Sequence, residues 1–414
     1  MSAAVSLTAE TVKVVDPRRL RSAKPRTRVE SIDMLRGAVM IVMALDHVRV
    51  FLHDAAYLHS PTDLGRTSAV LFFTRWVTHF CAPAFVFLAG LSACLYGARA
   101  GRKELSFFLA TRGAWLVFIE LFVLSLFRTF NPTYAYFNLQ VIWTIGLSMI
   151  ALSALIYLDR RLLLLVSAVL IAGHNLLDGV HLPGEGVTSF LWAVLHETHV
   201  FTLGRVTVRV MYPLLPWLGT MAAGYCFGRL YLADYDAARR RKILLWTGLS
   251  ATVLFVVLRF ANVYGDAAPW SIRDTATFTL LSFLNVTKYP PSLLYLLMTL
   301  GPALTFLALT ERSSSAVTAP VTVFGRVAMF YYLAHILLIH VAATVLAPLC
   351  GHAMADMVLS SAPSDAPSLK GYGFGLPTVY LLWLALVLVL YPCCRWYDRY
   401  KRRHQSTRWW LSYL

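Results

Sequence analysis

Ionisable side chains are concentrated in one apolar stretch near the start of the chain. Residues 35–53 contain Arg36, Asp46, His47, Arg49 and His53. Because a charge at the centre of a membrane costs at least about 2.5–3.5 kcal/mol, such groups usually face a partner or an aqueous pocket. Histidine exchanges a proton near neutral pH, so it can act as a general base on an amine or a hydroxyl. We therefore predict that His47 is catalytic, with Asp46 and Arg49 beside it and His53 at the pocket.

The spacing of Arg36 and His47 suits an extended anionic ligand. Eleven residues of helix bring two side chains to within about 20° of one face and separate them by about 16 Å along the axis. A ligand lying along this face would meet a cation at its phosphates and an imidazole at its other end. The alternative for Arg36 is an ordinary basic flank of a membrane span. Asp46 shares a helix face with Arg49 rather than with His47, because positions three apart are neighbours on a helix.

Three more histidines are candidates for the same pocket. His59 follows the first apolar stretch and reaches the pocket only if its loop folds over it. His79 lies at the start of the second apolar stretch, where it either lines the pocket or is a partnered histidine of the core. His335 and His340 lie about 140° apart around a helix, so both cannot face one site. We assign His59 to the catalytic candidates, and His79 and His335 to the substrate pocket.

Lys288 and Arg326 lie near a break or an end of an apolar stretch, where a cation could meet a phosphate. For Arg326 the alternative is contact with lipid headgroups. The sequence has no glycine-rich phosphate loop, no H-E-x-x-H and no G-x-S-x-G motif. Its histidines do not follow a familiar metal-ligand spacing. ATP-driven transport and metalloprotease chemistry therefore have no support, and we predict no metal site.

The composition excludes a soluble protein. Of the 414 residues, 58% are hydrophobic and 14% are charged, whereas soluble domains have roughly 45–50% apolar and about 25% charged residues. The high apolar content also excludes a disordered chain. A net charge of +16 can indicate nucleic-acid binding, but the uncharged stretches here are too long and too apolar for that class. We predict an all-α, polytopic membrane protein whose positive charge lies on one side, with lipids and no nucleic acid as partners.

About ten membrane-spanning helices are expected. Apolar stretches of about 16–28 residues recur along the chain, and roughly 20 residues span a bilayer as a helix. They cover 35–53, 70–97, 113–130, 138–158, 162–177, 210–232, 243–263, 277–310, 323–349 and 375–394. If 277–310 crosses once rather than re-entering, both basic termini lie in the cytosol, as the positive-inside rule favours. The segment 178–209 is predicted to contain an interfacial or re-entrant helix.

The stretch 277–310 is interrupted by Lys288-Tyr289-Pro290-Pro291. Proline removes a backbone donor and disfavours helix at the residue before it. A broken helix is tolerated in a membrane only where it is packed in protein or lines a wet cavity, so we predict that 285–291 lines a cavity. The chain then comprises a basic cytosolic tail (1–30), one transmembrane domain (31–395) and a basic, aromatic cytosolic tail (396–414).

Several stretches resemble bacterial proteins related to heparan-α-glucosaminide N-acetyltransferase. They are Arg-Val-Glu-Ser-Ile-Asp-Met-Leu-Arg-Gly (28–37) with 43–49, then 78–83, 216–219, 285–292, 324–326 with 331–335, and 409–414. Together they extend from about residue 28 to the end of the chain. Arg36 and His47 also match the pattern of Arg or Lys, ten residues and His that marks a broader set of membrane acyltransferases, including the acyltransferase 3 family.

The resemblance implies a ten-helix core that binds acetyl-CoA from the cytosol and delivers acetyl to an acceptor on the other side. Arg36, Lys288 and Arg326 would then bind the phosphates of the coenzyme. The lysosomal relative has asparagine where His47 stands, and its catalytic histidine falls nearest His59, so the two histidines compete for the principal role. We favour His47 because we expect it to be buried among charged neighbours. A homodimer is compatible with the resemblance.

The sequence therefore predicts an acetyltransferase of the bacterial inner membrane. It would transfer acetyl from acetyl-CoA to an amine or hydroxyl of an extracytoplasmic sugar or amine acceptor, with a histidine as general base or as transient carrier of the acetyl group. The alternative is a small-solute transporter that uses Asp46, His47 and Arg49 as a coupling path. Against a transporter, the sequence shows no inverted repeat and its spans do not divide into matching halves.

Overall fold

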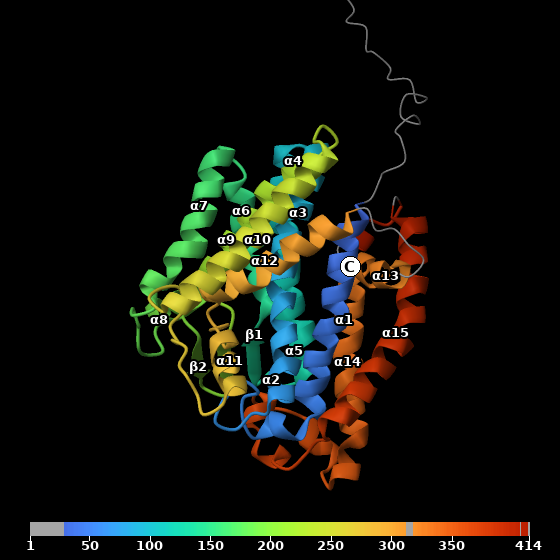
Figure 1. Ribbon diagram of the computed structural model, residues 1–414. Helices are drawn as coiled ribbons and strands as arrows, with labels where there is room; N and C mark the ends of the chain where they lie inside the picture. Colours follow the sequence, from blue (N-terminus) through green and yellow to red (C-terminus); the bar gives the residue numbers. More distant parts are fainter. Residues whose placement is uncertain (1–28, 312–317, 406, 413–414) are drawn as a thin grey trace, which may run out of the picture.

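The apolar stretches of the sequence form a bundle of long helices (Figure 1). The computed structural model describes residues 29–311, 318–405 and 407–412. Within that part of the chain, seven segments are helices long and apolar enough to cross a membrane: Ala69–Ala100, Arg102–Thr129, Arg160–Leu177, Ala237–Ala261, Leu293–Thr310, Ala328–Cys350 and Leu376–His404. Each overlaps one of the predicted stretches, although some of the bounds differ by ten residues or more, and this supports a multi-pass membrane protein.

The other three predicted spans are helices of a different kind. Helix α1 (Glu30–Leu52) has 23 residues, which is long enough for a bilayer, but it carries two acidic and two basic residues besides Glu30. Helices α6 (Val141–Leu155) and α9 (Leu214–Phe227) have 15 and 14 residues, shorter than the roughly 20 that a span needs. The mostly helical architecture is confirmed, and the number of ten crossings stays a prediction.

Helix α1 packs closely against α13 (Ala319–Arg326), and α14 (Ala328–Leu346) runs beside it (Figure 1). A Cβ atom on Gly37 would lie 1.9 Å from the carbonyl oxygen of Val321, and one on Gly325 would lie 1.9 Å from that of Asp33. Both positions therefore require glycine, because any side chain would push the two backbones apart. This contact fixes α1 beside α13, which is followed directly by α14, the helix that carries His335.

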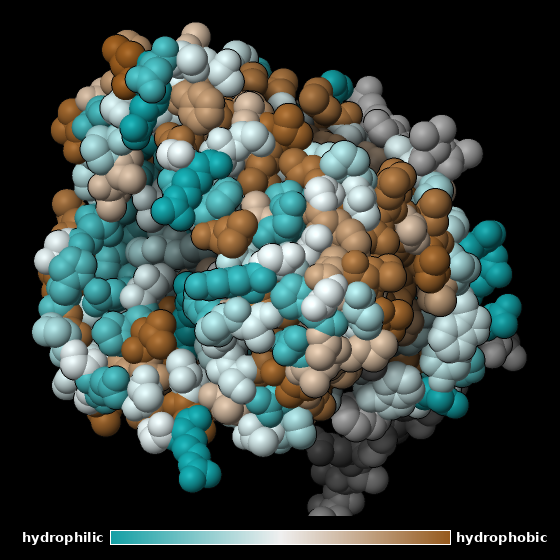
Figure 2. All heavy atoms as spheres, turned by 90° about the horizontal axis from the view of Figure 1, so that it is seen from below, coloured by the Kyte–Doolittle hydropathy of each residue, from teal (hydrophilic) through white to brown (hydrophobic). Residues whose placement is uncertain are grey.

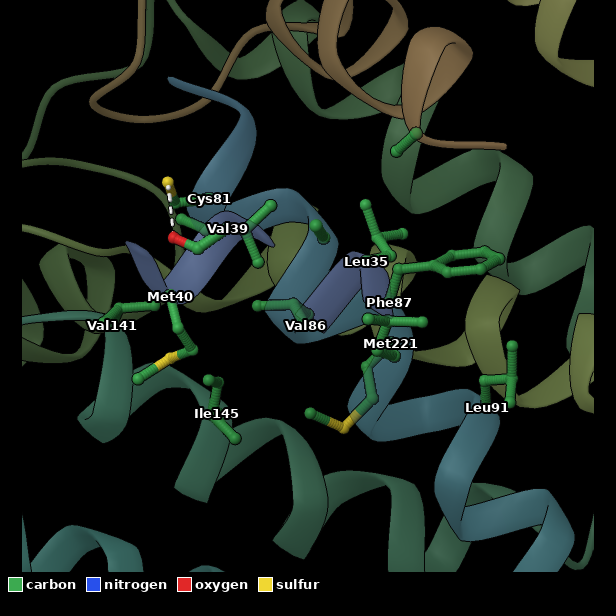
Figure 3. Close-up of a cluster of buried hydrophobic side chains, with 14 of the residues drawn as sticks. Leu35, Val39, Met40, Cys81, Val86, Phe87, Leu91, Val141, Ile145 and Met221 are labelled. Atoms are coloured by element: carbon green, nitrogen blue, oxygen red, sulfur yellow. Dashed lines mark hydrogen bonds between the residues drawn. The ribbon is translucent and has the colours of Figure 1, made fainter. Parts of the chain in front are cut away.

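Apolar side chains of α1 and of three other helices pack together around the first half of α1 (Figure 3). They come from α1, α3 (Cys81–Ala100), α6 and α9: Leu35, Val39, Met40, Cys81, Val86, Phe87, Leu91, Val141, Ile145 and Met221. The Cys81 thiol donates a hydrogen bond to the Val39 carbonyl oxygen at 3.3 Å. In a membrane such helices associate mainly through van der Waals packing. The packing holds α1 in position, with His47 about two turns beyond Met40.

A small sheet departs from the all-helical expectation. Strands β1 (Tyr136–Leu139), β3 (Val206–Val210) and β2 (His199–Leu203) lie in the order β1-β3-β2, with β1 parallel and β2 antiparallel to β3. The segment 178–209 does contain a helix, α8 (Val187–Leu195), but its second half is the β2–β3 hairpin. Alternating β-branched residues favour strands, and Gly204 (φ 63°) provides the turn between them.

The break predicted at 285–291 is present. Helix α11 (Ala276–Leu284) ends before it and α12 (Leu293–Thr310) begins after it. Asp266 holds the break, since its carboxylate accepts from the Thr287 backbone N–H and hydroxyl, both at 2.8 Å, and from the Ser292 hydroxyl at 2.6 Å. The Ser292 side chain in turn caps the first turn of α12 by accepting from the Tyr295 N–H.

Two further boundaries differ from the predicted segments. The stretch 323–349 is divided at Val327, between α13 and α14. Helix α15 (Leu376–His404) continues through residue 395, where the sequence analysis ends the transmembrane domain. The amphipathic pattern of its last turns, with basic residues toward the end, extends the helix beyond the apolar run. The predicted basic tail at 1–30 lies outside the described residues except for its last two positions.

Candidate functional site

A cavity of about 800 Å³ lies beside the second half of α1. It is lined by α1, by the short α2 (Ala69–Trp76) and the turn after it, by α5 (Ser125–Thr129), by β1, and by loops that include 58–62, 285–289 and 361–365. Figure 2 shows the end of the molecule where α1 terminates, where hydrophilic side chains border a recess. The predicted break at 285–291 contributes five residues to the lining, so its cavity-lining position is confirmed.

His47 lines this cavity and is bonded to His335 behind it. His47 Nδ1 and His335 Nε2 are 2.7 Å apart, and the two rings stack with centroids 5.0 Å apart and planes 14° apart. His335 is fully buried on α14 and is not part of the lining. The 288 residues that separate the two histidines in sequence hide this pair from any local motif.

The hydrogen-bond network assigns the protons of the pair. His335 Nδ1 lies 2.8 Å from the Tyr331 carbonyl oxygen, which can only accept, so Nδ1 carries the proton. In the neutral ring, Nε2 of His335 is then an acceptor, and His47 donates to it from Nδ1. That proton leaves Nε2 of His47 with a free lone pair, which is the form that a general base or a nucleophile requires.

Besides His335, helix α14 places a second aromatic side chain beside His47. The Tyr332 ring meets the imidazole edge-on, with centroids 6.0 Å apart. The Tyr332 hydroxyl accepts from Arg128 Nη2 at 2.7 Å, and Arg128 Nη1 is paired with Glu120 at 2.5 Å. Glu120 lies in a π-helical turn (Ile119–Leu124) between α4 (Arg102–Phe118) and α5. The partner of Glu120, which the sequence did not indicate, is therefore Arg128.

Asp46 forms ion pairs with arginines and does not orient His47. Its Oδ1 accepts from Arg49 Nη2 at 2.9 Å, and its Oδ2 accepts from Arg75 of α2. Arg75 also donates to the Tyr289 hydroxyl at 3.1 Å, and Lys288 Nζ lies 5.3 Å from the centre of the Tyr289 ring. The pairing of Asp46 with Arg49 is the one that helix geometry predicts, whereas Arg75 enters from another part of the chain.

Positive charge predominates around the cavity. Among the described residues, its lining contains five cationic side chains and two carboxylates: Arg49, Arg75, Arg128, Arg209 and Lys288 against Asp46 and Asp365. Arg209 lies on β3, opposite Asn138 of β1, so the small sheet brings it to the cavity. An excess of cations in a partly enclosed space favours an anionic ligand.

Of the four other histidines considered in the sequence analysis, two line the cavity and two do not. His59 lines the cavity, with Nδ1 3.1 Å from the Ser60 carbonyl oxygen. His79 also lines it, is 2% exposed, and has no hydrogen-bond partner for Nδ1 among the described residues. His53 does not line it, because it caps α1 and its Nε2 lies 3.5 Å from Asp54. His340 bonds to the Phe127 and Met357 carbonyls, away from His335.

The three cations predicted to bind phosphate do not lie together. Arg36 donates to Asp33 and to the Gly325 carbonyl, and Arg326 is paired with Asp398 of α15 at 3.0 Å. Neither of them lines the cavity, whereas Lys288 does. The apolar length of 277–310 did not fix the position of its break, and the structure places residues 285–289 in the lining of the same cavity as His47.

Comparison with known proteins gives one family. The catalytic-domain sequence model of heparan-alpha-glucosaminide N-acetyltransferase matches residues 28–261, more than half of the chain. The chain belongs to this family. No curated protein matches the chain.

The region that matches the heparan-α-glucosaminide N-acetyltransferase family contains only part of the cavity. Asp46, His47, His59 and Arg75 fall within it, as do His79 and Arg128. Lys288 and His335 lie beyond residue 261. The proton acceptor of His47 and one of the five cavity cations are therefore supplied by the part of this family member that follows the match.

Sequence reasoning missed several residues of the site. Arg75, Arg128 and Arg209 line the cavity, and Tyr289 and Tyr332 bond to two of these arginines. A signal existed for Arg75 and Arg128, since both are charged residues within long apolar stretches and such groups usually face a partner or a pocket. For Arg209 the alternation of residues 199–210 is typical of a strand, which the helix predicted over 178–209 did not take into account, and its position beside the cavity depends on pairing with β1.

Proposed function

We propose that this protein is a transmembrane acetyltransferase that transfers acetyl from acetyl-CoA to an amine or hydroxyl of a sugar acceptor, with His47 as its base. The observation that carries the proposal is the His47–His335 hydrogen bond beside a cationic cavity. Family membership supports acetyl transfer, and the geometry supports the role of His47. The acceptor would enter at the end of the molecule where α1 terminates, and acetyl-CoA would approach from the end that carries Arg36.

In direct transfer, Nε2 of His47 removes a proton from the acceptor as its nitrogen or oxygen attacks the thioester carbonyl. The C–S bond breaks, and the departing CoA thiolate takes the proton from the imidazolium. In the two-step route, Nε2 itself attacks the carbonyl and the C–S bond breaks, which leaves an acetyl-imidazolium and CoA thiolate. The acceptor then attacks the acetyl carbonyl, the bond from acetyl to Nε2 breaks, and the freed Nε2 takes the acceptor's proton and releases it to the thiolate or to water. Both routes need a free lone pair on Nε2, and both use His335 to hold the proton on Nδ1.

Other residues have supporting roles in this proposal. Asp46 balances Arg49 and Arg75 and so fixes two cations at the cavity wall. Lys288 is the coenzyme-binding candidate nearest His47, whereas Arg36 and Arg326 would act at the coenzyme entrance. His59 and His79 line the acceptor side of the cavity. Arg36 and Arg326 keep 21% and 18% of their side chains exposed despite their carboxylate partners, so both can still meet an anionic ligand.

The test uses the purified chain in detergent or in vesicles with radiolabelled acetyl-CoA and a panel of amino sugars. We expect acetyl transfer by the wild type, loss of transfer in His47→Ala, and unchanged coenzyme-induced thermal stabilisation in that variant. His352→Ala is the control, because His352 bonds to the Ser368 carbonyl outside the cavity. A folded wild type that neither transfers acetyl nor responds to the coenzyme, but carries a small solute across vesicles, would favour the transporter alternative.

A further inference from the structure

A second group of buried ionisable side chains lies outside the cavity. His174 begins the 3₁₀ turn His174–Leu177 that follows α7 (Arg160–Gly173), and His196 follows α8. The fold brings these two histidines together with Asp178, so that one ligand atom from each residue lies within 4.8 Å of the other two. The spacing of four and eighteen residues matches no familiar metal motif, which is why the sequence analysis predicted no metal site.

The imidazoles of this group lack hydrogen-bond partners. His174 and His196 are each 3% exposed. Neither ring nitrogen of His174, nor Nδ1 of His196, has a hydrogen-bond partner in the described part of the chain. Buried polar groups are nearly always satisfied in native proteins, so two such rings side by side indicate that something else occupies their lone pairs. The rings lie with centroids 5.6 Å apart and planes 62° apart.

Asp178 completes the group in an orientation that suits ligation. Its Oδ2 accepts from Asn175 Nδ2 at 2.9 Å, which orients the carboxylate, and its Oδ1 lies 3.2 Å from His196 Nε2. The Asp178 side chain remains 22% exposed, so water can reach that side of the group.

We propose that His174, Asp178 and His196 bind a divalent transition-metal ion of the zinc class, with a fourth coordination position open to water. Two imidazoles and one carboxylate are a common ligand set for zinc, which prefers tetrahedral geometry with bonds of about 2.0–2.2 Å. Ligand atoms around such an ion lie about 3.3 Å apart, so His196 and Asp178 already have the required separation. His174 would have to move toward them on binding.

The site would stabilise the wall of the catalytic cavity. Asn175, which orients Asp178, also accepts from the Leu293 N–H at 2.9 Å through its own Oδ1. Leu293 begins α12, directly after the segment that carries Lys288 and Tyr289 to the cavity. A metal ion would thus connect the end of α7, the loop after α8 and the start of α12. The proposal concerns metal binding that stabilises this wall, and it is independent of the proposed acetyl transfer.

The test measures metal binding directly, on the full chain purified through a tag without histidines. After treatment with a chelator, dialysis against zinc and desalting, we expect stoichiometric zinc by mass spectrometry. Cobalt in place of zinc should give the intense visible absorption of a tetrahedral site. His174→Gln and His196→Gln should each lose the metal. His181→Gln is the matched control and should keep it, because His181 lies on the same loop but its side chain is 67% exposed and paired with Glu197.

Two outcomes would overturn the proposal directly: no stoichiometric zinc in the wild type, or unchanged zinc content in both ligand variants. A third is a loss of zinc from His181→Gln as large as the loss from the ligand variants, which would indicate adventitious surface binding. If the His174→Gln and His196→Gln variants do not fold, the measurements on the wild-type protein alone test the proposal. A tetrahedral cobalt spectrum and a melting temperature that falls with chelator and recovers with zinc support the site. Absence of either response contradicts it.

Discussion

The two histidine pairs of this molecule have opposite surroundings. His47 and His335 share a hydrogen bond, and His335 has a second bond to a backbone carbonyl, so a proton can be assigned to each Nδ1. His174 and His196 also stand side by side, but none of their four ring nitrogens has a hydrogen-bond partner among the described residues, although His196 Nε2 lies 3.2 Å from an Asp178 carboxylate oxygen. A bonded pair with one lone pair toward a cavity suits proton transfer. A pair in which each neutral imidazole has an unpartnered lone pair suits a metal ion.

The aspartates beside the two histidine pairs also differ in their partners. Asp46 is adjacent to His47 in sequence, yet both of its oxygens bind arginines. Asp178 has one oxygen on Asn175 and presents the other to His196. Adjacency in sequence is therefore a poor guide to which carboxylate serves which histidine. The predictions below separate the two pairs by changing one member at a time.

The largest effect is expected from His47→Ala. Removal of a general base typically lowers the rate by about 10²–10⁴-fold, so kcat for acetyl transfer should fall by that factor. Zinc retention at His174, Asp178 and His196 should not change, because the two pairs have no residue in common. Steady-state kinetics and zinc content on the same preparation check both expectations. Loss of zinc together with activity would show that the variant disturbs the whole fold and that the pairs are not independent.

The second-largest effect is expected from Asp46→Asn, which should lower the free energy of unfolding rather than act on the chemical step. Removing one partner of a buried ion pair costs about 3–5 kcal/mol, because it leaves uncompensated charge. We expect the lower end, since the Asp46 side chain is 15% exposed. Asp63→Asn is the control, because its pair with Arg66 is largely exposed at 3.9 Å and such pairs contribute about 0–1 kcal/mol. Unfolding in detergent measures the difference, and equal loss in both variants would contradict a buried Asp46 network.

The first pair could be predicted only in part from sequence. Charged residues in an apolar stretch identified His47, Asp46 and Arg49, because the cost of burying charge applies wherever the chain folds. The partner His335 could not be assigned, since its contact depends on how α14 packs against α1, next to the close α1–α13 contact at Gly37 and Gly325. The second pair was invisible, because His174 and His196 become neighbours only after the loop from α7 to α8 folds back.

The fold, like the site, could be predicted where the signal is local in the sequence and not where it depends on packing. Long apolar runs determined where helices form, and the break at 285–291 followed from two prolines. The ion pair of Glu120 and Arg128 did not follow, because positions eight apart lie about 80° from each other on an ideal α-helix, and an intervening π-helical turn changes that angle. The β2–β3 hairpin had a readable signal in its alternating residues and Gly204, which the search for apolar spans passed over.

A smaller effect is expected from His335→Phe, which keeps an aromatic ring but removes the acceptor for His47 Nδ1–H. Residues that orient a ligand or base through a hydrogen bond typically contribute about 10–100-fold, so kcat should fall by that factor while KM for acetyl-CoA stays the same. His335→Gln should restore most of the rate, because its carbonyl oxygen can accept the same proton. Equal defects in both variants would indicate that His335 only fills space beneath His47.

The smallest effect is expected from His59→Ala, and it decides between the two catalytic candidates. His59 lines the cavity, but it is partly exposed, and the only described hydrogen bond of its imidazole is to the carbonyl of the next residue. Unlike His47, it has no partner that fixes its tautomer or its orientation. We therefore expect kcat to fall by less than the roughly 10²-fold that loss of a general base costs, with the larger change in KM for the acceptor. Acetyl transfer by the two single variants, measured side by side, settles the order: if His59→Ala abolishes transfer while His47→Ala retains it, the base is His59 and the His47–His335 bond has a structural role.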